Sequence, residues 1–415
     1  MNRPKVVITG MGLVSVLGHT LEEYWDGLIG GKSGIGKISH FDSSEMPCQI
    51  AGEINNFYPS QLFGRKQARR MPRSAQLALS AAINAVKHAE LPDTMAEPER
   101  ASVYFGTAMG GIDFLEDGIK NLHKNGYRKV SPFTAGGVIP NYSAFLIGKQ
   151  FQCLGPNSTI ATACATGTQA IGEGSEFIRR GVADIVLVGG TESFIRDFAV
   201  AGFTAMRGLP TNYNDNPTAA SRPFDANREG FVLSEGAAVL VLESERHARG
   251  RGAEIHAVVA GHSSSSDGYH MAAPNPDAKG PIRAMRWALE DADLDPAQVD
   301  YINAHGTSTP LNDEIETKAI KTFFGEQAYN IPISSTKSML GHAMGASGAL
   351  EAIACVLAIK HDLIPPTINY ETPDPTCDLD YTPNHAKQVD VNVVLSNSFG
   401  LGGQNACLVL KEYSA

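Results

Sequence analysis

A lone cysteine in a run of small residues is the side chain best placed to do chemistry. Cys164 lies in the segment 162–168, which reads TACATGT, and a helical pattern follows it directly. A thiol at a helix amino terminus meets unpaired N–H groups and the positive end of the helix dipole, which stabilise a thiolate. The thiolate is the nucleophilic form, so this position predicts covalent acyl chemistry. The alternative, more common for a single cysteine, is a small buried core residue.

Two histidines in glycine-containing loops favour the chemical interpretation. His305 follows an apolar run in the motif AHGTST, and His342 stands before a second helical pattern in the motif GHAMGASG. Sites in α/β proteins form at the carboxyl ends of strands, and a helix amino terminus favours a neutral imidazole. Two neutral imidazoles could stabilise an enolate oxygen that develops beside a thioester. Lys337, Asp313 and Glu316 are close enough in the sequence to orient the rings.

A glycine-rich segment near the carboxyl end, NSFGLGGQN at 397–405, is the third candidate. Its glycines permit close approach and backbone conformations closed to other residues. The segment could supply an N–H group to an oxyanion hole and carry an apolar gate. No helix begins there, so it is not a phosphate-binding loop; the alternative is a tight turn between strands.

Short apolar runs that alternate with helical patterns predict an α/β sheet covered by helices. We expect strands at 6–8, 102–105, 185–188 and 238–242, and helices at 74–89 and 168–180. Four elements recur in the same order: 5–10 and 254–261, 102–105 and 299–303, 162–178 and 337–359, and 236–243 and 405–412. This order predicts two duplicated halves, 1–252 with the cysteine and 253–415 with both histidines, joined by the polar stretch 244–253.

Composition sets the broad class. The chain has 415 residues, 43% of them hydrophobic, and a net charge of −10, which predicts a globular protein with a large core and no broad attraction to nucleic acid. Local basic patches can still bind an acidic partner. No signal peptide is recognised and no apolar run approaches membrane-spanning length, so we expect a cytoplasmic protein that binds no membrane. The cysteines show no CxxC pair or zinc spacing, and we expect most to be buried thiols: Cys48, Cys153, Cys164, Cys355, Cys377 and Cys407.

Together these motifs resemble the β-ketoacyl-[acyl-carrier-protein] synthases, most closely the type II elongating condensing enzymes of the thiolase superfamily. The resemblance begins at VITGMG (7–12), continues through RPFDANREGFVL (222–233), and covers both histidine loops and the glycine-rich segment. It implies a five-layer αβαβα thiolase-like fold and a homodimer. It also implies decarboxylative condensation of an enzyme-bound acyl thioester with malonyl-[acyl-carrier-protein], which gives 3-oxoacyl-[acyl-carrier-protein] in fatty-acid elongation.

The resemblance also assigns roles to residues. Cys164 would carry the acyl chain, His305 and His342 would assist decarboxylation, and Lys337 and Glu316 would position the histidines. The N–H groups of Cys164 and Leu401 would form the oxyanion hole, with Leu401 and Phe399 at the gate. The remaining assignments are the acyl pocket (Met109, Phe203), the pantetheine site (Thr307, Thr309, His270) and the carrier-protein dock (Lys66, Arg69, Arg70, Arg128, Lys129, Arg207). No cofactor or catalytic metal is implied; some members hold a structural monovalent cation near the positions of Asn303 and Glu351.

Three positions depart from the family pattern. Leu401 replaces the usual gate phenylalanine, Ala272 replaces a usual threonine near the pantetheine, and Met109 stands where a bulky aliphatic residue often limits chain length. Methionine is adaptable. These departures leave the acyl-chain length and the pathway open.

Four alternatives can be compared with the motifs. A thiolase would carry a second reactive cysteine near Asn397 and Ser398, and the third class of condensing enzyme would have an asparagine in place of His342. A non-catalytic chain-length-factor subunit would lack Cys164. A polyketide or polyene ketosynthase, which would form a heterodimer with such a factor, uses the same three residues and stays open.

Overall fold

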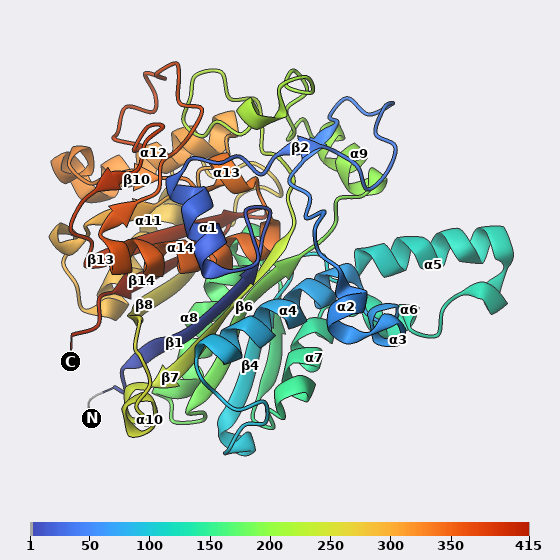
Figure 1. Cartoon of the computed structure of the whole chain (residues 1–415). Coiled ribbons are helices and arrows are strands. Elements are labelled where there is room, and N and C mark those ends of the chain that lie inside the picture. The colour runs from blue at the N-terminus through green and yellow to red at the C-terminus, as the bar shows by residue number, and fades with distance from the viewer. Residues whose placement is uncertain (1–2, 415) are drawn as a thin grey trace.

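Two sets of strands meet edge to edge in one 10-stranded sheet (Figure 1). The computed structural model describes residues 3–414. The first set consists of β1 (Val6–Val14), β4 (Ala101–Gly106), β5 (Asn157–Ile160), β6 (Ile185–Glu192) and β7 (Gly236–Ser244). The second consists of β8 (Ala257–Ser266), β9 (Tyr301–Asn303), β10 (Ile333–Ser334), β13 (Val393–Gly400) and β14 (Gln404–Lys411). β1 and β8 pair antiparallel where the sets meet.

The two sets have the same strand order and the same directions. From the junction outward, the first runs β1-β7-β6-β4-β5 and the second runs β8-β14-β13-β9-β10. In each, the first three strands pair antiparallel and the other neighbours pair parallel. The sequence repeats fall on equivalent elements, which confirms the expected duplication within an α/β fold. The boundary after residue 252 falls in the turn after α10 (Glu245–Gly250) and stays a prediction.

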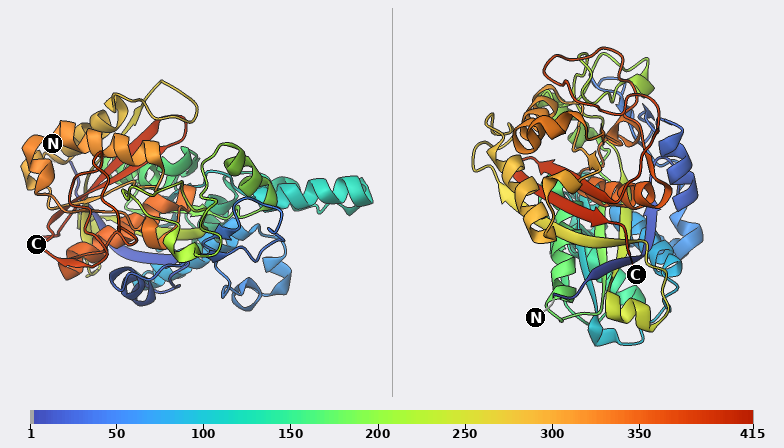
Figure 2. Two further views of the ribbon diagram at one scale, coloured as in Figure 1. Left: turned by 90° about the horizontal axis from the view of Figure 1, so that it is seen from above. Right: turned by 90° about the vertical axis from the view of Figure 1, so that its left-hand side faces the viewer.

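Helices form three layers around the two halves of the sheet (Figure 2). α4 (Arg73–His88) and α7 (Tyr142–Phe151) cover the outer face of the first half. α11 (Lys279–Ala292) and α12 (Pro310–Phe324) cover the outer face of the second. Between the halves lie α8 (Thr166–Arg179) and α14 (Ser347–His361), which contact each other and strands of both halves. This is the αβαβα layering that the resemblance implies.

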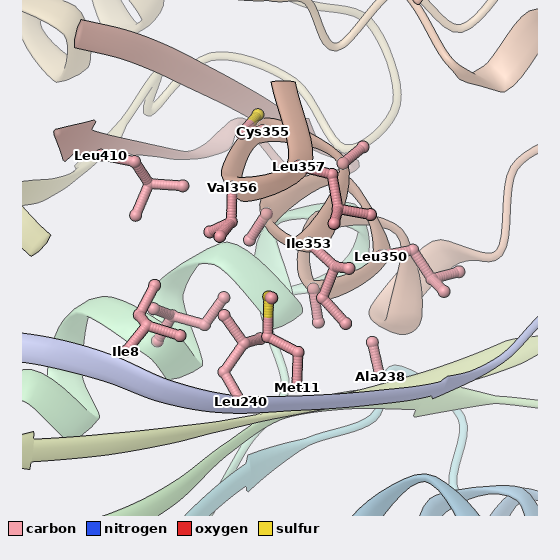
Figure 3. Close-up of a cluster of buried hydrophobic side chains, with 14 of the residues drawn as sticks. Ile8, Met11, Ala238, Leu240, Leu350, Ile353, Cys355, Val356, Leu357 and Leu410 are labelled. Atoms are coloured by element: carbon pink, nitrogen blue, oxygen red, sulfur yellow. The ribbon is translucent and has the colours of Figure 1, made fainter. Parts of the chain in front are cut away.

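The central helix α14 is buried along its length up to Ile359. Figure 3 shows its side chain Ile353 facing Met11 and Leu240 on the strands. The 18-residue window 344–361 is long and apolar enough to cross a membrane, which corrects the expectation that no apolar run approaches that length. Since 89% of this window is buried inside the protein, its apolar character serves the core.

A helical arm projects from the body of the molecule (Figures 1 and 2). It consists of α5 (Ile112–Asn125), the turn Tyr127–Lys129 and the return through α6 (Thr134–Val138). Within α5 only Gly118 is buried. The sequence patterns did not predict this element.

The shorter helices connect these layers, and several of them carry residues of the candidate site. They are α1 (Leu21–Ile29), α2 (Pro59–Phe63), α3 (Arg65–Ala68), α9 (Asp197–Ala205) and α13 (Lys337–Leu340). Two small two-stranded sheets, β2 (Gly36–Lys37) with β3 (Ile50–Ala51) and β11 (Leu363–Ile364) with β12 (Lys387–Gln388), lie outside the main sheet.

Candidate active site

Cys164 lies where the chain turns sharply into the central helix α8. It belongs to the 3-10 turn Ala163–Ala165, and α8 follows at Thr166. Ala163 has a left-handed backbone with φ 50°, a conformation that non-glycine residues adopt mainly at constrained sites. His342 stands in the corresponding place in the second half, before the turn Met344–Ala346 that leads into α14. His305 follows β9.

Two glycines bring the amino termini of α8 and α14 together. A Cβ atom on Gly348 would lie 2.1 Å from Thr168 Oγ1, and one on Gly167 would lie 2.7 Å from the Ala349 nitrogen. Any side chain at either position would therefore separate the helices. The glycines set the distance between Cys164 and His342.

The three predicted reactive side chains meet. His342 Nε2 lies 3.0 Å from Cys164 Sγ, and one ligand atom from each of Cys164, His305 and His342 lies within 4.8 Å of the others. The two imidazole rings meet edge to face, with centroids 5.5 Å apart. The exposed fractions are 4% for Cys164 and 2% for each histidine. The sequence prediction of one cysteine with two histidines is therefore confirmed as an arrangement in space.

The prediction of a resting thiolate is not supported. Burial raises the pKa of the Cys164 thiol to about 11 and outweighs the opposing effects of the Leu401 N–H, the Lys337 charge and the cysteine's own N–H. The helix start is present, as predicted, but desolvation of the charged form is the larger effect. Burial, reinforced by Lys337, also holds the pKa of His305 and His342 well below the ordinary value. The thiol and both imidazoles are neutral near pH 7.

The groups expected to orient the imidazoles do so indirectly. Both carboxylate oxygens of Glu316 accept backbone N–H groups, from His305 and from Gly306, each at 2.8 Å. Lys337 forms a buried ion pair with Glu351. Glu316 therefore fixes the loop that carries His305, whereas Lys337 acts on the rings through its charge.

Asp313 also lies away from the rings. It accepts the Phe224 N–H at 2.9 Å and lies 3.7 Å from the Arg228 guanidinium. Asp313 contacts neither ring, and it acts on His305 only through the loop that carries it, where it also accepts the Ser308 N–H. The sequence separation was suggestive, but α12 directs this carboxylate toward the segment 224–228.

The glycine-rich segment is both a tight turn and part of the site. Residues 401–403 join β13 to β14, and the Gly402 N–H donates to the Met271 carbonyl at 2.9 Å. The Leu401 N–H is close enough to the Cys164 sulfur to lower its pKa. Phe399 meets the His305 ring with centroids 5.8 Å apart. Leu401, Phe399 and Cys164 therefore lie together, as predicted.

A cavity of about 460 Å³ opens above the three reactive residues. Thr307 and Thr309, whose hydroxyl oxygens are 2.9 Å apart, line it together with His270, Arg207 and Leu401. The His270 Nδ1 accepts the N–H groups of Ala272 and Ala273 at 3.1 Å, so this side chain also holds its own loop. The predicted pantetheine residues therefore share the cavity that holds Cys164.

A second, strongly apolar cavity of about 720 Å³ lies beside the arm. Of these two cavities Met109 lines the second, whereas Phe203 lines both and contacts Phe194 and Phe231. The prediction placed Met109 and Phe203 in one acyl pocket. The structure instead places Phe203 on the wall between the two cavities. Met109 is 39% exposed and lies in the second cavity, the outer cavity beside α5 and α9.

The predicted basic dock is exposed but spread over three elements. Lys66 lies on α3, and Arg69 and Arg70 follow directly after it. Arg128 and Lys129 lie at the tip of the arm, and Arg207 lines the mouth of the first cavity. Within residues 3–414 none of these six side chains forms an ion pair, and Arg70 lies 4.7 Å from the Phe133 ring centroid. Their charges are therefore available to an acidic partner.

Four residues of the site were missed by sequence reasoning. Met344 Sδ lies 3.5 Å from Cys164 Sγ, and Phe231 meets the His342 ring edge to face. Ser347 Oγ lies 3.0 Å from His342 Nδ1, and Glu192 binds the loop at Ala108 and the loop at Gly345. Ser347 could have been found from its place five residues after His342 at a helix start. The other three become neighbours only through the fold.

Two clusters have donor atoms that suit a cation. Glu176, His262 and Asp291 gather at the surface, but Arg3 and Arg179 already pair with both carboxylates. In the interior, Asn303 Oδ1 and Glu351 Oε2 are buried without a hydrogen-bond partner in the described part of the chain. Oxygen donors of this type fit the monovalent cation that the resemblance implies, although Lys337 already neutralises Glu351.

Two family models match the chain from residue 3 to residue 371 with one short gap. The model of the β-ketoacyl synthase N-terminal domain matches residues 3–248, and that of the C-terminal domain matches 256–371. The 3-oxoacyl-[acyl-carrier-protein] synthase 2 of Synechocystis is 45% identical over 413 residues, with 100% of this chain and 99% of the relative covered. Enzymes of the same name from Staphylococcus aureus and Coxiella burnetii are 45% and 44% identical, each covering 99% of both chains.

Solved structures agree at the level of the fold. A β-ketoacyl synthase from Burkholderia phymatum has a TM-score of 0.92 and 36% identity, covering 99% of this chain and 100% of its own. The ishigamide ketosynthase/chain length factor has a TM-score of 0.93 and 37% identity, with the same coverage. A type II polyketide ketosynthase solved with its acyl-carrier protein, bound to the hexaketide, has a TM-score of 0.92 and 34% identity, covering 100% of both chains. With its Cys164, His305 and His342 cluster and its duplicated five-layer fold, the chain belongs to the β-ketoacyl synthase family.

Proposed function

We propose that this enzyme is a 3-oxoacyl-[acyl-carrier-protein] synthase that elongates fatty acyl chains. It would condense an acyl group held on Cys164 with malonyl-[acyl-carrier-protein] and release carbon dioxide. The observation that carries the proposal is the contact of Cys164 Sγ with His342 Nε2 at 3.0 Å on the floor of a cavity that His305 also lines. The 45% identity to synthase 2 enzymes over the full chain supports the elongating type.

The first half-reaction is a thiol exchange. Cys164 Sγ forms a bond to the acyl carbonyl carbon, the carbonyl electrons move to oxygen, and the carrier sulfur then leaves. The proton lost by Cys164 is balanced by the proton that the carrier thiol gains. The N–H groups of Cys164 and Leu401, both close to the sulfur, are the donors for the oxyanion. Because the resting thiol is neutral, it must give up its proton as the new S–C bond forms, and the departing carrier sulfur takes up that proton.

The second half-reaction needs donors, and both histidines are neutral. When the malonyl C–C bond breaks, its electron pair moves into the thioester as an enolate. N–H groups of His305 and His342 would stabilise the enolate oxygen. The enolate carbon then attacks the Cys164 thioester, a new C–C bond forms, and Cys164 leaves as a thiolate that regains a proton. No redox or nucleotide cofactor is needed, since one C–C bond replaces another.

The two cavities suggest the substrate path. Thr307, Thr309 and His270 would contact the pantetheine arm in the outer part of the first cavity. The acyl chain would pass Phe203 toward the second cavity, where Met109 and the α5 side chains provide an apolar lining. Asn303 and Glu351 would hold the structural cation that the resemblance implies.

The partners follow from charge and exposed apolar surface. An acidic carrier protein would dock against Arg207 and the other cations named above, which lack ion pairs in the described residues. A second copy of this chain would cover the arm and extend the sheet at β5, whose outer edge pairs with no other strand of residues 3–414. We place the enzyme in the cytoplasm, where carrier-bound intermediates are handled, and expect it to bind neither membrane nor nucleic acid.

The competing function is that of a polyketide ketosynthase. One of the similar solved structures is a type II polyketide ketosynthase at 34% identity, and another is a ketosynthase/chain length factor at 37%. The synthase 2 enzymes are more similar, at 44–45% over the whole chain. The elongation of fatty acyl chains is therefore favoured.

The decisive experiment is mass spectrometry of the protein after incubation with acyl-carrier thioesters of graded chain length. We expect acylation at Cys164 and, after addition of malonyl carrier, release of the 3-oxoacyl product. Cys164→Ala should abolish both signals while the thermal unfolding midpoint stays unchanged. Full elongation by that variant would overturn the mechanism, and acylation without a fatty 3-oxoacyl product would favour the polyketide function.

A further inference from the structure

The His342 ring has a side-chain partner on the side away from Cys164. Ser347 Oγ lies 3.0 Å from His342 Nδ1, and Nε2 faces Cys164 Sγ on the opposite side. Ser347 is the first residue of α14 and is 4% exposed. The backbone of His342 is also fixed, since its N–H donates to Val232 and its carbonyl accepts from Ser234. The ring therefore sits between a hydroxyl and the nucleophile.

The Ser347 hydroxyl has a single hydrogen-bond acceptor available. Among residues 3–414, Ser347 Oγ makes no hydrogen bond other than that with His342 Nδ1. If Nδ1 carried the ring proton, it would donate to Ser347 and leave the hydroxyl proton buried without an acceptor, which is unfavourable. If Nδ1 is unprotonated, it accepts the hydroxyl proton and both groups are satisfied.

We propose that Ser347 is a positioning residue that holds neutral His342 as the tautomer with its proton on Nε2. This inference rests on the proposed condensation. It makes Nε2 a permanent donor aimed at the sulfur and at the substrate oxygen beside it. His342 therefore stabilises charge on sulfur and on the enolate oxygen, and it does not accept the thiol proton. The tautomer of His305 is not fixed in this way, because its Nδ1 has no hydrogen-bond partner within the described chain.

Substitution of Ser347 should separate the two half-reactions. We expect Ser347→Ala to slow decarboxylation of malonyl-[acyl-carrier-protein] about tenfold, because the competing tautomer presents a lone pair to the enolate oxygen. Acylation of Cys164 should fall less, since two backbone N–H groups still face the sulfur. Ser347→Thr retains the hydroxyl and should restore the rate; Ser347→Cys, a weak donor, should fall between.

The pH profile distinguishes this role from a merely structural one. A hydrogen bond donated to the unprotonated Nδ1 favours the neutral ring, so its loss raises the pKa of His342. The acid limb of the decarboxylation profile should therefore move to higher pH in Ser347→Ala but stay in place in Ser347→Thr. Ser175→Ala is the matched control, because it removes another buried helix hydroxyl, which donates to the Gly172 carbonyl.

The outcomes separate this inference from the proposed function. An unchanged acid limb in Ser347→Ala, or an equal loss in both half-reactions with a lower unfolding temperature, would refute the positioning role. If the wild-type protein is not acylated by acyl-carrier thioesters, the proposed function itself fails. If the wild type is active and Ser347→Ala has the same rates and the same pH profile, only the role of Ser347 is refuted.

Discussion

Two opposed effects act on Cys164 at the scale of the single residue. The helix start and the nearby N–H groups favour the thiolate, while burial raises the pKa of the thiol to about 11. We therefore expect alkylation of Cys164 by iodoacetamide in the free enzyme to be slow near neutral pH and to accelerate as the pH rises toward that value. Peptide mass spectrometry would follow the label. A rate that levels off below about pH 8 would show that the resting thiol is already ionised.

Leu401 is the second residue whose effect can be isolated. Its N–H is a backbone group that every substituent retains, whereas its half-buried side chain lines the cavity above Cys164. Leu401→Phe should therefore change the preference among acyl-chain lengths several-fold and change malonyl decarboxylation little. Competition between acyl carriers of graded length measures the first, and carbon dioxide release the second. Leu401→Met, a change of similar volume, is the control; unchanged selectivity in Leu401→Phe would exclude a gate.

At the scale of elements, Glu192 joins two loops from different parts of the chain. At the end of β6, it accepts the N–H groups of Ala108 at 2.7 Å, Met109 at 3.1 Å and Gly345 at 3.3 Å. Glu192 thereby links the loop of Ala108 and Met109, beside the outer cavity, to the turn that follows His342. Burial raises the pKa of this carboxyl from 4.5 to about 7 despite these bonds.

That shift predicts a pH dependence of stability. Between 4.5 and about 7 the folded state holds a proton on Glu192 that the unfolded state releases, so its stabilisation is complete below 4.5 and is lost as pH rises through about 7. Glu192→Gln cannot titrate. We compare the free energy of unfolding of the variant with that of the wild type at each pH. The difference should shift in favour of the variant by about 1 kcal/mol or more between pH 5 and pH 8. Urea unfolding would measure it, with exposed Glu314→Gln as control; a constant difference would contradict the shift.

The elements also show what the sequence could reveal. The repeats, the helix starts at Cys164 and His342 and the glycine-rich segment 397–405 could be predicted, because local patterns and short motifs encode them. The contacts through which Glu316 and Asp313 act could not, since these contacts depend on how α12 turns beside the loop of residues 303–309. The same holds for Met109, which follows β4 as expected but faces a cavity that α5 and α9 create.

At the scale of the whole molecule, the helical arm carries apolar side chains that the rest of the chain leaves exposed. Leu115, Ile119 and Leu122 lie at helical spacing along one face of α5, with exposed fractions of 37%, 47% and 45%. Apolar stripes of this kind are normally covered. Leu115 and Ile119 also line the outer cavity, so whatever covers the arm also closes the proposed acyl pocket.

This geometry links assembly to substrate choice. If a second copy covers the arm, Ile119→Glu with Leu122→Glu would bury two charges in the interface and raise the dissociation constant of the dimer at least about tenfold. We expect sedimentation equilibrium to show monomers, and long acyl chains to lose their advantage over short ones because the outer cavity opens to water. Trp287→Glu, 43% exposed on α11 in the opposite outer layer, should leave both properties unchanged. A wild-type chain that is itself monomeric, and pairs only with a chain lacking the nucleophile, would instead indicate the heterodimer of a polyketide system.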